Sequence, residues 1–275
     1  MDSLLNLPVA TGSAARILQI TDPHLFASKD QTLLGVNTWQ SFQAVLGAIR
    51  AQAWHCDLIV ATGDLVQDQT AEAYQHFAQA IAELPAPCVW LPGNHDEQQA
   101  MGYELTKAGL STAKQILLGD AWQLVMLDSQ LPGVPHGELS EYQLNWLEAA
   151  LARYPERYTL VSLHHHPHPS GCSWLDQHSL RNAPMLAALL ESYPKAHTLL
   201  CGHIHQSLDV NWQGRRLLAS PSTCIQFKPH CSQFTIDTES PGWRWVELHS
   251  DGRLETRVER LQTRAFCPDP DAEGY

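Results

Sequence analysis

Short apolar runs alternate with longer amphipathic segments over the first two hundred residues of the chain. A short continuous apolar run is typical of a buried strand, whereas apolar positions that recur every three or four residues predict a helix. The expected strands cover residues 16–21, 57–62, 87–91, 158–163 and 197–201, and the expected helices cover residues 38–52, 70–84, a segment beginning at Ser140, and 179–192. Ser140 and Gln143 have the spacing of a capping box.

After residue 209 the pattern changes to shorter β-like pieces. They cover residues 209–212, 216–220, 234–237, 243–248 and 254–260, and glycine or proline separates several of them. We therefore expect an α/β chain of the α+β four-layer type, with two packed mixed β-sheets and helices on the outside. A single domain over residues 16–262 would follow an N-terminal extension (1–15) and precede a flexible acidic tail (263–275).

Composition and charge narrow the classes of partner. The chain has 275 residues, and its 44% of hydrophobic residues excludes a mainly disordered protein. Its 17 Lys+Arg against 29 Asp+Glu give a net charge of −12, so we expect neither nucleic acid nor a membrane as a partner. The sequence shows no secretory signal, spanning segment or C-x-x-C pair, which favours a cytoplasmic protein with reduced thiols.

Polar residues follow each of the five expected strands at the point where the strand ends. The five segments are Asp22-Pro23-His24, Gly63-Asp64, Gly93-Asn94-His95-Asp96, His164-His165-His166 and Gly202-His203-Ile204-His205. One such residue is ordinary in a turn or a helix cap. Five successive cases are not, because a buried strand does not tolerate a charged end without a partner. Since ligands bind at the carboxyl ends of strands in α/β folds, we expect these side chains to meet.

The chemistry of this set predicts a site for two metal ions. Carboxylate, amide oxygen and imidazole form a hard-to-borderline ligand set without thiolate, which suits iron, manganese, zinc or magnesium. One carboxylate can bridge two cations, and two metals about 3.5–4 Å apart can clamp both the attacking and the leaving oxygen of a phosphoryl displacement. The backbone could approach such a crowded site closely at Gly63, Gly93 and Gly202, because glycine has no side chain.

These motifs resemble the complete signature of the calcineurin-like metallophosphoesterase family. Residues 33–39, 220–231 and 237–252 further resemble the bacterial class III 3′,5′-cyclic AMP phosphodiesterases, and the likeness runs from Arg16 to Leu261. The resemblance implies hydrolysis of cyclic AMP to 5′-AMP with two divalent cations per chain. Fe²⁺ or Mn²⁺ would be the principal candidates, with Mg²⁺ or Zn²⁺ as alternatives.

The resemblance also assigns roles to individual side chains. The first metal would be held by Asp22, His24, Asp64 and His205, and the second by Asp64, Asn94, His164 and His203, with Asp64 bridging. His95 would protonate the leaving oxygen, and Asp96 would orient or tune His95. The residues expected on the substrate phosphate are His24, Asp64, Asn94, His95, His164 and His205. Within the histidine run, His164 directly follows the strand; His165 is the alternative and His166 is disfavoured.

The implied reaction leaves several alternatives open. Two cations would lower the pKa of a bridging water, and in-line attack of the hydroxide would expel the 3′-oxygen of the cyclic ester. A broad-specificity metallophosphodiesterase or a nucleotidase would use the same residues. A protein phosphatase is disfavoured, because Gln67-Asp68-Gln69 stands where those enzymes carry Arg-Gly. A non-catalytic scaffold is disfavoured because His95 is present. The chain would be a monomer or a homodimer.

Overall fold

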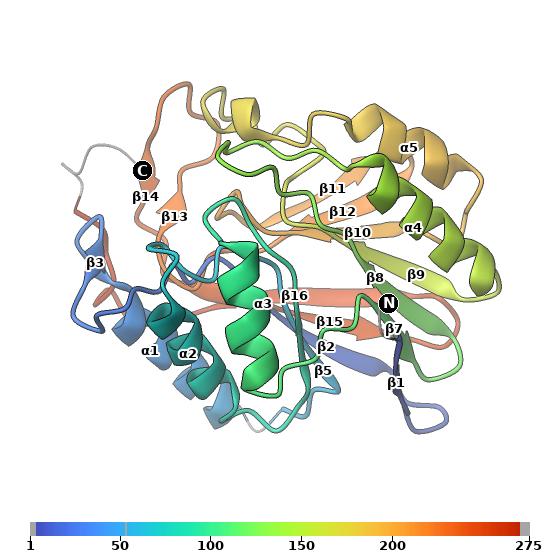
Figure 1. Ribbon diagram of the computed structural model, residues 1–275, viewed down its shortest axis with the longest axis horizontal. Coiled ribbons are helices and arrows are strands. Elements are labelled where there is room, and N and C mark those ends of the chain that lie inside the picture. Colours follow the sequence, from blue (N-terminus) through green and yellow to red (C-terminus); the bar gives the residue numbers. More distant parts are fainter. Residues whose placement is uncertain (1–3, 53, 270–275) are drawn as a thin grey trace.

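The chain folds into two β-sheets packed face to face, with helices on the outer side of each sheet (Figure 1). The computed structural model describes residues 4–52 and 54–269. The larger sheet has seven strands in the order β1-β7-β8-β9-β10-β12-β11. Their bounds are β1 (Leu4–Leu7), β7 (Gln115–Leu118), β8 (Trp122–Met126), β9 (Tyr158–Ser162), β10 (Thr198–Cys201), β12 (Arg215–Ala219) and β11 (Leu208–Trp212).

The smaller sheet has five strands in the order β16-β15-β2-β5-β6. These are β16 (Leu254–Arg260), β15 (Gly242–Leu248), β2 (Ala15–Ile20), β5 (Leu58–Ala61) and β6 (Cys88–Trp90). This sheet is covered by α1 (Thr38–Ala51), α2 (Ala71–Ile81) and α3 (Gln98–Lys107), and the larger sheet by α4 (Glu141–Arg153) and α5 (Ala183–Glu191). Shorter pieces are β3 (Thr32–Leu33), β4 (Val36–Asn37), β13 (Gln226–Phe227), β14 (Ile236–Asp237) and the 3-10 turn η1 (Leu175–His178).

Three apolar layers hold this four-layer arrangement together. In β2, Ile17 packs between the two sheets and Leu18 packs against the helices of the smaller sheet. In β9, Leu160 likewise packs between the two sheets, and Val161 packs against the helices of the larger sheet. Both faces of β2 and of β9 are thus buried, which is why these two strands are continuous apolar runs rather than alternating ones.

The predicted fold class is confirmed, as is most of the alternation between strands and helices. The helix predicted from Ser140 is α4, and the Ser140 hydroxyl accepts the Gln143 N–H at 3.3 Å. The Gln143 side chain does not complete the capping box, because it accepts the N–H of Asp128 at 3.2 Å instead. Trp243 and Trp245 of β15 are fully buried in the core.

Several elements differ from the expectation. Strands β7 and β8 were not predicted, although both are buried in the larger sheet. The helix predicted over residues 179–192 begins only at Ala183, one residue before Pro184, which suits the first turn of a helix. Helix α3 was not predicted, because only Met101 and Leu105 of its apolar residues are buried. Strand β1 lies in the expected N-terminal extension, yet it pairs in parallel with β7.

Part of the C-terminal segment that was expected to be flexible packs against the rest of the molecule. Phe266 packs against the hydrophobic core, and the N–H of Asp269 donates to the Leu34 carbonyl at 2.9 Å. The remainder of the expected flexible tail, residues 270–275, lies outside the described residues. Among the described helices, none has the length and apolar character needed to cross a membrane.

Candidate metal centre

The five polar segments meet at one edge of the two sheets. Strands β2, β5 and β6 run parallel in one sheet, and β9 and β10 run parallel in the other, so their carboxyl ends lie together. Backbone hydrogen bonds join the loops: the Asp22 N–H donates to the Gly63 carbonyl and the Gly202 N–H to the His164 carbonyl, each at 3.1 Å. The His203 N–H also donates to Oδ2 of Asp22 at 3.2 Å, so residues 181 positions apart are fixed against one another.

The backbone is strained at this edge. Five of the predicted ligands have φ angles in the left-handed region, namely Asp22 (53°), His24 (46°), Asp64 (50°), His203 (68°) and His205 (49°). Such a conformation costs a non-glycine residue about 1–3 kcal/mol and persists only where the surroundings enforce it. Strain concentrated in this way is typical of a functional site.

One group of neighbouring side chains consists of Asp22, His24, Asp64 and His205, all of them buried. The Nε2 atoms of His24 and His205 are 3.2 Å apart. The Nε2 atom of His205 lies 3.4 Å from Oδ1 of Asp22, and that of His24 lies 3.9 Å from Oδ2 of Asp64. This is the set that the sequence predicts for the first metal.

A second group gathers around His164. Its Nε2 atom lies 3.3 Å from Oδ2 of Asp64 and 3.2 Å from Oδ1 of Asn94. The His203 ring lies with its centroid 4.9 Å from that of His164. Oδ2 of Asp64 therefore faces both His24 and His164, which is the geometry that a bridging carboxylate needs.

In three histidines, the ring nitrogen that points away from the centre, Nδ1, lies within hydrogen-bond distance of a neighbouring oxygen. Nδ1 of His164 lies 2.7 Å from the Thr62 carbonyl, and Nδ1 of His205 lies 2.9 Å from the Ile225 carbonyl. A carbonyl only accepts, so both imidazoles carry a proton on Nδ1 and direct Nε2 toward the centre. Nδ1 of His24 is held at 2.7 Å by Oε1 of Gln67.

The pKa values keep most of these groups in their ligand forms. Burial lowers the pKa of His24 to about 3 and that of His203 well below its usual value, so both imidazoles are neutral. Burial opposes ionisation of Asp64, but the nearby His164 and His95 bring its pKa well below the usual range. Burial also opposes protonation of His164, yet the Asp64 carboxylate raises that pKa to about 9. A divalent cation would displace this proton on binding.

The residues present fit two divalent cations. Nε2 of His203 is buried and has no hydrogen-bond partner within the described residues, which costs about 1–3 kcal/mol unless another ligand satisfies it. Together with the carboxylates of Asp22 and Asp64 and the Asn94 amide oxygen, it completes a donor set typical of iron, manganese, zinc or magnesium.

The histidine run points in three directions. His164 faces Asp64 and Asn94. His165 approaches His164 and His203, while its Nδ1 lies 2.8 Å from the Ser129 hydroxyl. His166 turns to Asp176, whose Oδ1 is 3.5 Å from its Nε2. Nε2 of His165 is also buried without a hydrogen-bond partner within the described residues, so His164 stays the predicted ligand and His165 the alternative.

His95 lies at the border of the centre, half-buried. Its ring stands edge-on to the His24 ring, with centroids 5.0 Å apart, and its backbone N–H donates to Oδ1 of Asp64 at 2.8 Å. Beside it opens a cavity of about 300 Å³ that His203, Trp174 and Phe227 also line. The imidazole is therefore close both to the predicted ligands and to space for a substrate.

Asp96 acts on the loops rather than on His95 directly. Its carboxylate accepts the N–H groups of Gly93 at 2.9 Å, Leu65 at 3.1 Å and Val66 at 3.3 Å, and the Tyr74 hydroxyl at 3.2 Å. Burial and the Asp64 charge raise its pKa to about 7, whereas these donors favour ionisation. Asp96 is thus a positioning residue that ties the segment of Asp64 to the segment of Asn94 and His95.

Several residues that shape the site carry no sequence signal. Nε2 of Gln130 donates to the Gly93 carbonyl at 2.7 Å and to the Asp96 carbonyl at 2.5 Å. The Ser222 hydroxyl donates to the Asp22 carbonyl at 2.6 Å. Phe227 stacks on His205, with centroids 4.3 Å apart and planes inclined by 9°. The Phe227 ring thus contacts His205 and also lines the cavity.

Replacing Gly93 by alanine is expected to weaken cation binding by about ten- to hundredfold, as changes around metal ligands do. An added Cβ would lie 2.1 Å from Oδ1 of Asp64 and 2.5 Å from its backbone nitrogen, so the carboxylate would have to move. Titration of the purified variant with Mn²⁺ by calorimetry measures the loss. Gly47→Ala is the matched control, because its Cβ would meet nothing closer than 3.9 Å. Equal affinities for Gly93→Ala and the unaltered chain would contradict the prediction.

Comparisons with known proteins agree with this geometry. Residues 15–207 match a family model described as calcineurin-like phosphoesterase. The chain is 64% identical, over the whole of both chains, to the 3′,5′-cyclic adenosine monophosphate phosphodiesterase CpdA of Escherichia coli K12. It is 49% identical to CpdA of Haemophilus influenzae over 94% of this chain and 95% of that protein.

A solved structure shows the same fold at much lower identity. A dimetal phosphatase from Danio rerio superposes with a TM-score of 0.57 and 15% identity, covering 90% of this chain and 99% of that one. The family model covers more than half of the chain and includes all five polar segments. This chain therefore belongs to the calcineurin-like phosphoesterase family.

Proposed function

We propose that this chain hydrolyses 3′,5′-cyclic AMP to 5′-AMP with the help of two divalent cations. The observation that carries the proposal is the 64% identity, over the full length of both chains, to a protein named as a 3′,5′-cyclic adenosine monophosphate phosphodiesterase. The arrangement of buried carboxylate, amide and imidazole donors supports it, because such a set suits metal-assisted hydrolysis of a phosphate ester.

The proposed ligands divide between two positions. Asp22, His24, Asp64 and His205 would hold one cation, and Asp64, Asn94, His164 and His203 the other. When bound, such cations activate water and neutralise charge on the phosphate. The proposed contacts with the phosphate group come from His24, Asp64, Asn94, His95, His164 and His205.

His95 would donate a proton to the 3′-oxygen as it leaves. Its half-buried imidazole borders the cavity of about 300 Å³, so it reaches a substrate without being displaced from the loop. The backbone of the same residue is fixed by Asp64, and the loop around it is fixed by Asp96 and Gln130. This anchoring holds the imidazole in one place during the proton transfer, as general acid catalysis requires.

The proposal extends to the cation, the compartment and the assembly. Fe²⁺ or Mn²⁺ would serve, with Mg²⁺ or Zn²⁺ as alternatives that the donor set also accepts. The cytoplasm is the proposed compartment; the seven cysteines are free thiols, as is usual in a reducing environment. The assembly would be a monomer or a homodimer.

Removal of divalent cations is expected to lower the melting temperature by about 5–10 °C. A cation present at a hundred times its dissociation constant stabilises the folded state by about 2.7 kcal/mol, and each kcal/mol moves the midpoint of a chain of this size by about 2–4 °C. Calorimetry of the chelated protein, before and after addition of Mn²⁺ or Fe²⁺, measures the shift. An unchanged midpoint with restored metal content would contradict cation binding at the buried centre.

Comparison of substrates tests the proposed activity itself. The metal-loaded chain is expected to have a much higher kcat/KM for cyclic AMP than for bis(p-nitrophenyl) phosphate, a diester without a nucleoside. Cyclic GMP is included to measure selectivity for the base. A clear preference for the synthetic diester would replace this proposal by a broad-specificity phosphodiesterase, and absence of hydrolysis by the metal-loaded chain would indicate a scaffold.

A further inference from the structure

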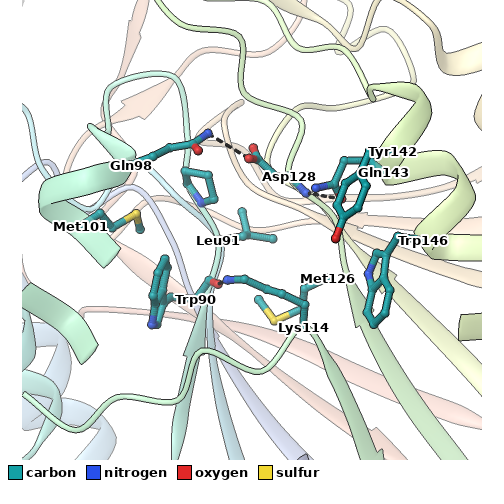
Figure 2. Close-up of a pocket in the computed structure, with 11 residues that line it drawn as sticks. Trp90, Leu91, Gln98, Met101, Lys114, Met126, Asp128, Tyr142, Gln143 and Trp146 are labelled. Atoms are coloured by element: carbon teal, nitrogen blue, oxygen red, sulfur yellow. Dashed lines mark hydrogen bonds between the residues drawn. The ribbon is translucent and has the colours of Figure 1, made fainter. Parts of the chain in front are cut away.

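A second cavity lies at the edge of the molecule where β6 and α3 face β8 and α4. Its volume is about 220 Å³, and its lining shares no residue with the predicted metal ligands. Figure 2 shows Trp90 on one side, Trp146 on the other, and Leu91 between them. The proposed reaction assigns no role to this cavity.

The walls of the cavity are largely aromatic. Tyr142 and Trp146 lie one helical turn apart on α4 and face Trp90 across the opening (Figure 2). Met101 and Met126 also line the cavity, and methionine adapts readily to the shape of an aromatic ligand. Flat walls on opposite sides favour a planar molecule, because aromatic rings stack with a partner in parallel or edge-on.

The charged groups of the cavity have opposite signs. Nζ of Lys114 donates to the Trp90 carbonyl and lies 4.0 Å from the centre of the Trp90 ring. Oδ2 of Asp128 accepts from Nε2 of Gln98 at 2.9 Å, on the other side of Leu91 (Figure 2). One cation and one anion favour an uncharged ligand with both an acceptor and a donor over a phosphate.

We propose that this cavity binds an uncharged, planar nitrogen heterocycle of the size of a nucleobase. A ring nitrogen would accept from Lys114, and an exocyclic amine would donate to Asp128. The size suffices, because a cavity of about 150 Å³ already holds benzene, and this one is about 220 Å³.

A chain of hydrogen bonds links this cavity to the metal centre. Gln98, which binds Asp128, also donates to Oε1 of Gln130 at 2.7 Å. Gln130 in turn holds the Gly93 and Asp96 carbonyls, which flank Asn94 and His95. Gln130 is also tied to Asp128 directly, because its backbone N–H donates to Oδ1 of Asp128 at 2.9 Å. A ligand amine that competes for the Asp128 carboxylate thereby weakens the hold on Gln130. The ligand therefore changes the turnover of the centre as well as occupying the cavity.

Equilibrium binding of adenine to the full-length chain, followed by calorimetry, tests the proposal. Tyr142→Ala is expected to weaken binding at least tenfold, and Tyr103→Ala is the matched control, since the two side chains are 64% and 66% exposed and only Tyr142 lines the cavity. Asp128→Asn is expected to weaken binding as well. Melting curves of all variants establish that they are folded.

A variant of the other cavity separates this site from the proposed substrate site. Trp174→Ala alters the cavity beside His95 and is expected to leave adenine binding unchanged. Loss of binding in Trp174→Ala but not in Tyr142→Ala would overturn the proposal, and so would absence of binding to the unaltered chain. Hydrolysis of bis(p-nitrophenyl) phosphate at a rate unaffected by bound adenine would overturn the coupling through Gln130.

Discussion

Asp64→Asn is expected to release both cations and to lower turnover by about a thousandfold or more. Oδ2 of Asp64 faces Nε2 of His164 at 3.3 Å and Nε2 of His24 at 3.9 Å, so a single carboxylate serves both positions. A divalent cation supplies several kcal/mol of charge stabilisation to a phosphoryl transition state. Loss of about 4 kcal/mol corresponds to about a thousandfold in rate.

Asparagine is the informative replacement because it separates charge from shape. Oδ1 of Asp64 accepts the backbone N–H of His95 at 2.8 Å, and an asparagine oxygen can keep that bond while the negative charge is lost. Elemental analysis of the purified variant, together with initial rates under added Mn²⁺, measures both effects. Asp209→Asn is the control, since Asp209 pairs with Arg216 on the surface. Two retained cations per chain would refute the bridging assignment.

The residues at the strand ends were predictable because their signal is local. A buried strand requires apolar residues, so an Asp, Asn or His directly after it stands out in the sequence. Asp22, Asp64 and Asn94 were found in this way, and the parallel strand order then brings them together. The resemblance to a family supplied what the pattern could not, namely which metal each residue would hold and the role of His95.

The supporting contacts were not predictable because their partners are distant or belong to the backbone. His164 is oriented by the Thr62 carbonyl, 102 positions away, and every residue has such a carbonyl. Gln67 and Gln130 look like ordinary polar loop residues until the fold places them beside His24 and Gly93. Asp96 was expected to act on His95, whereas its carboxylate is occupied by backbone N–H groups and Tyr74.

Two elements that bury few apolar side chains, α3 and β1, were missed for a related reason, whereas the missed strands β7 and β8 are fully buried. Helix α3 buries little apart from Met101 and Leu105, so its periodicity is weak. Strand β1 is an edge strand with alternately exposed positions, and it depends on pairing with β7 rather than on burial. In both cases tertiary contacts, and not the local sequence, determine the structure.

His95→Gln is expected to lower the turnover of cyclic AMP by about a hundred- to ten-thousandfold, the range that a general acid contributes. The leaving 3′-oxygen of a ribose is a strongly basic alkoxide unless it is protonated as the bond breaks. Glutamine keeps the polar character and much of the volume of the side chain, and the N–H that binds Asp64 belongs to the backbone. The variant should therefore fold and bind two cations normally, as measured by elemental analysis.

The leaving group distinguishes a proton donor from a merely structural histidine. The p-nitrophenolate released from bis(p-nitrophenyl) phosphate is a weak base that leaves without protonation, so its turnover should fall far less than that of cyclic AMP. If both substrates lose turnover equally, His95 acts by holding the loop or the phosphate instead. If the variant instead loses bound cations, His95 is a metal ligand, since its ring lies edge-on to that of His24 and close to Asp64. The ratio of the two rate losses therefore reports on the role of this one imidazole.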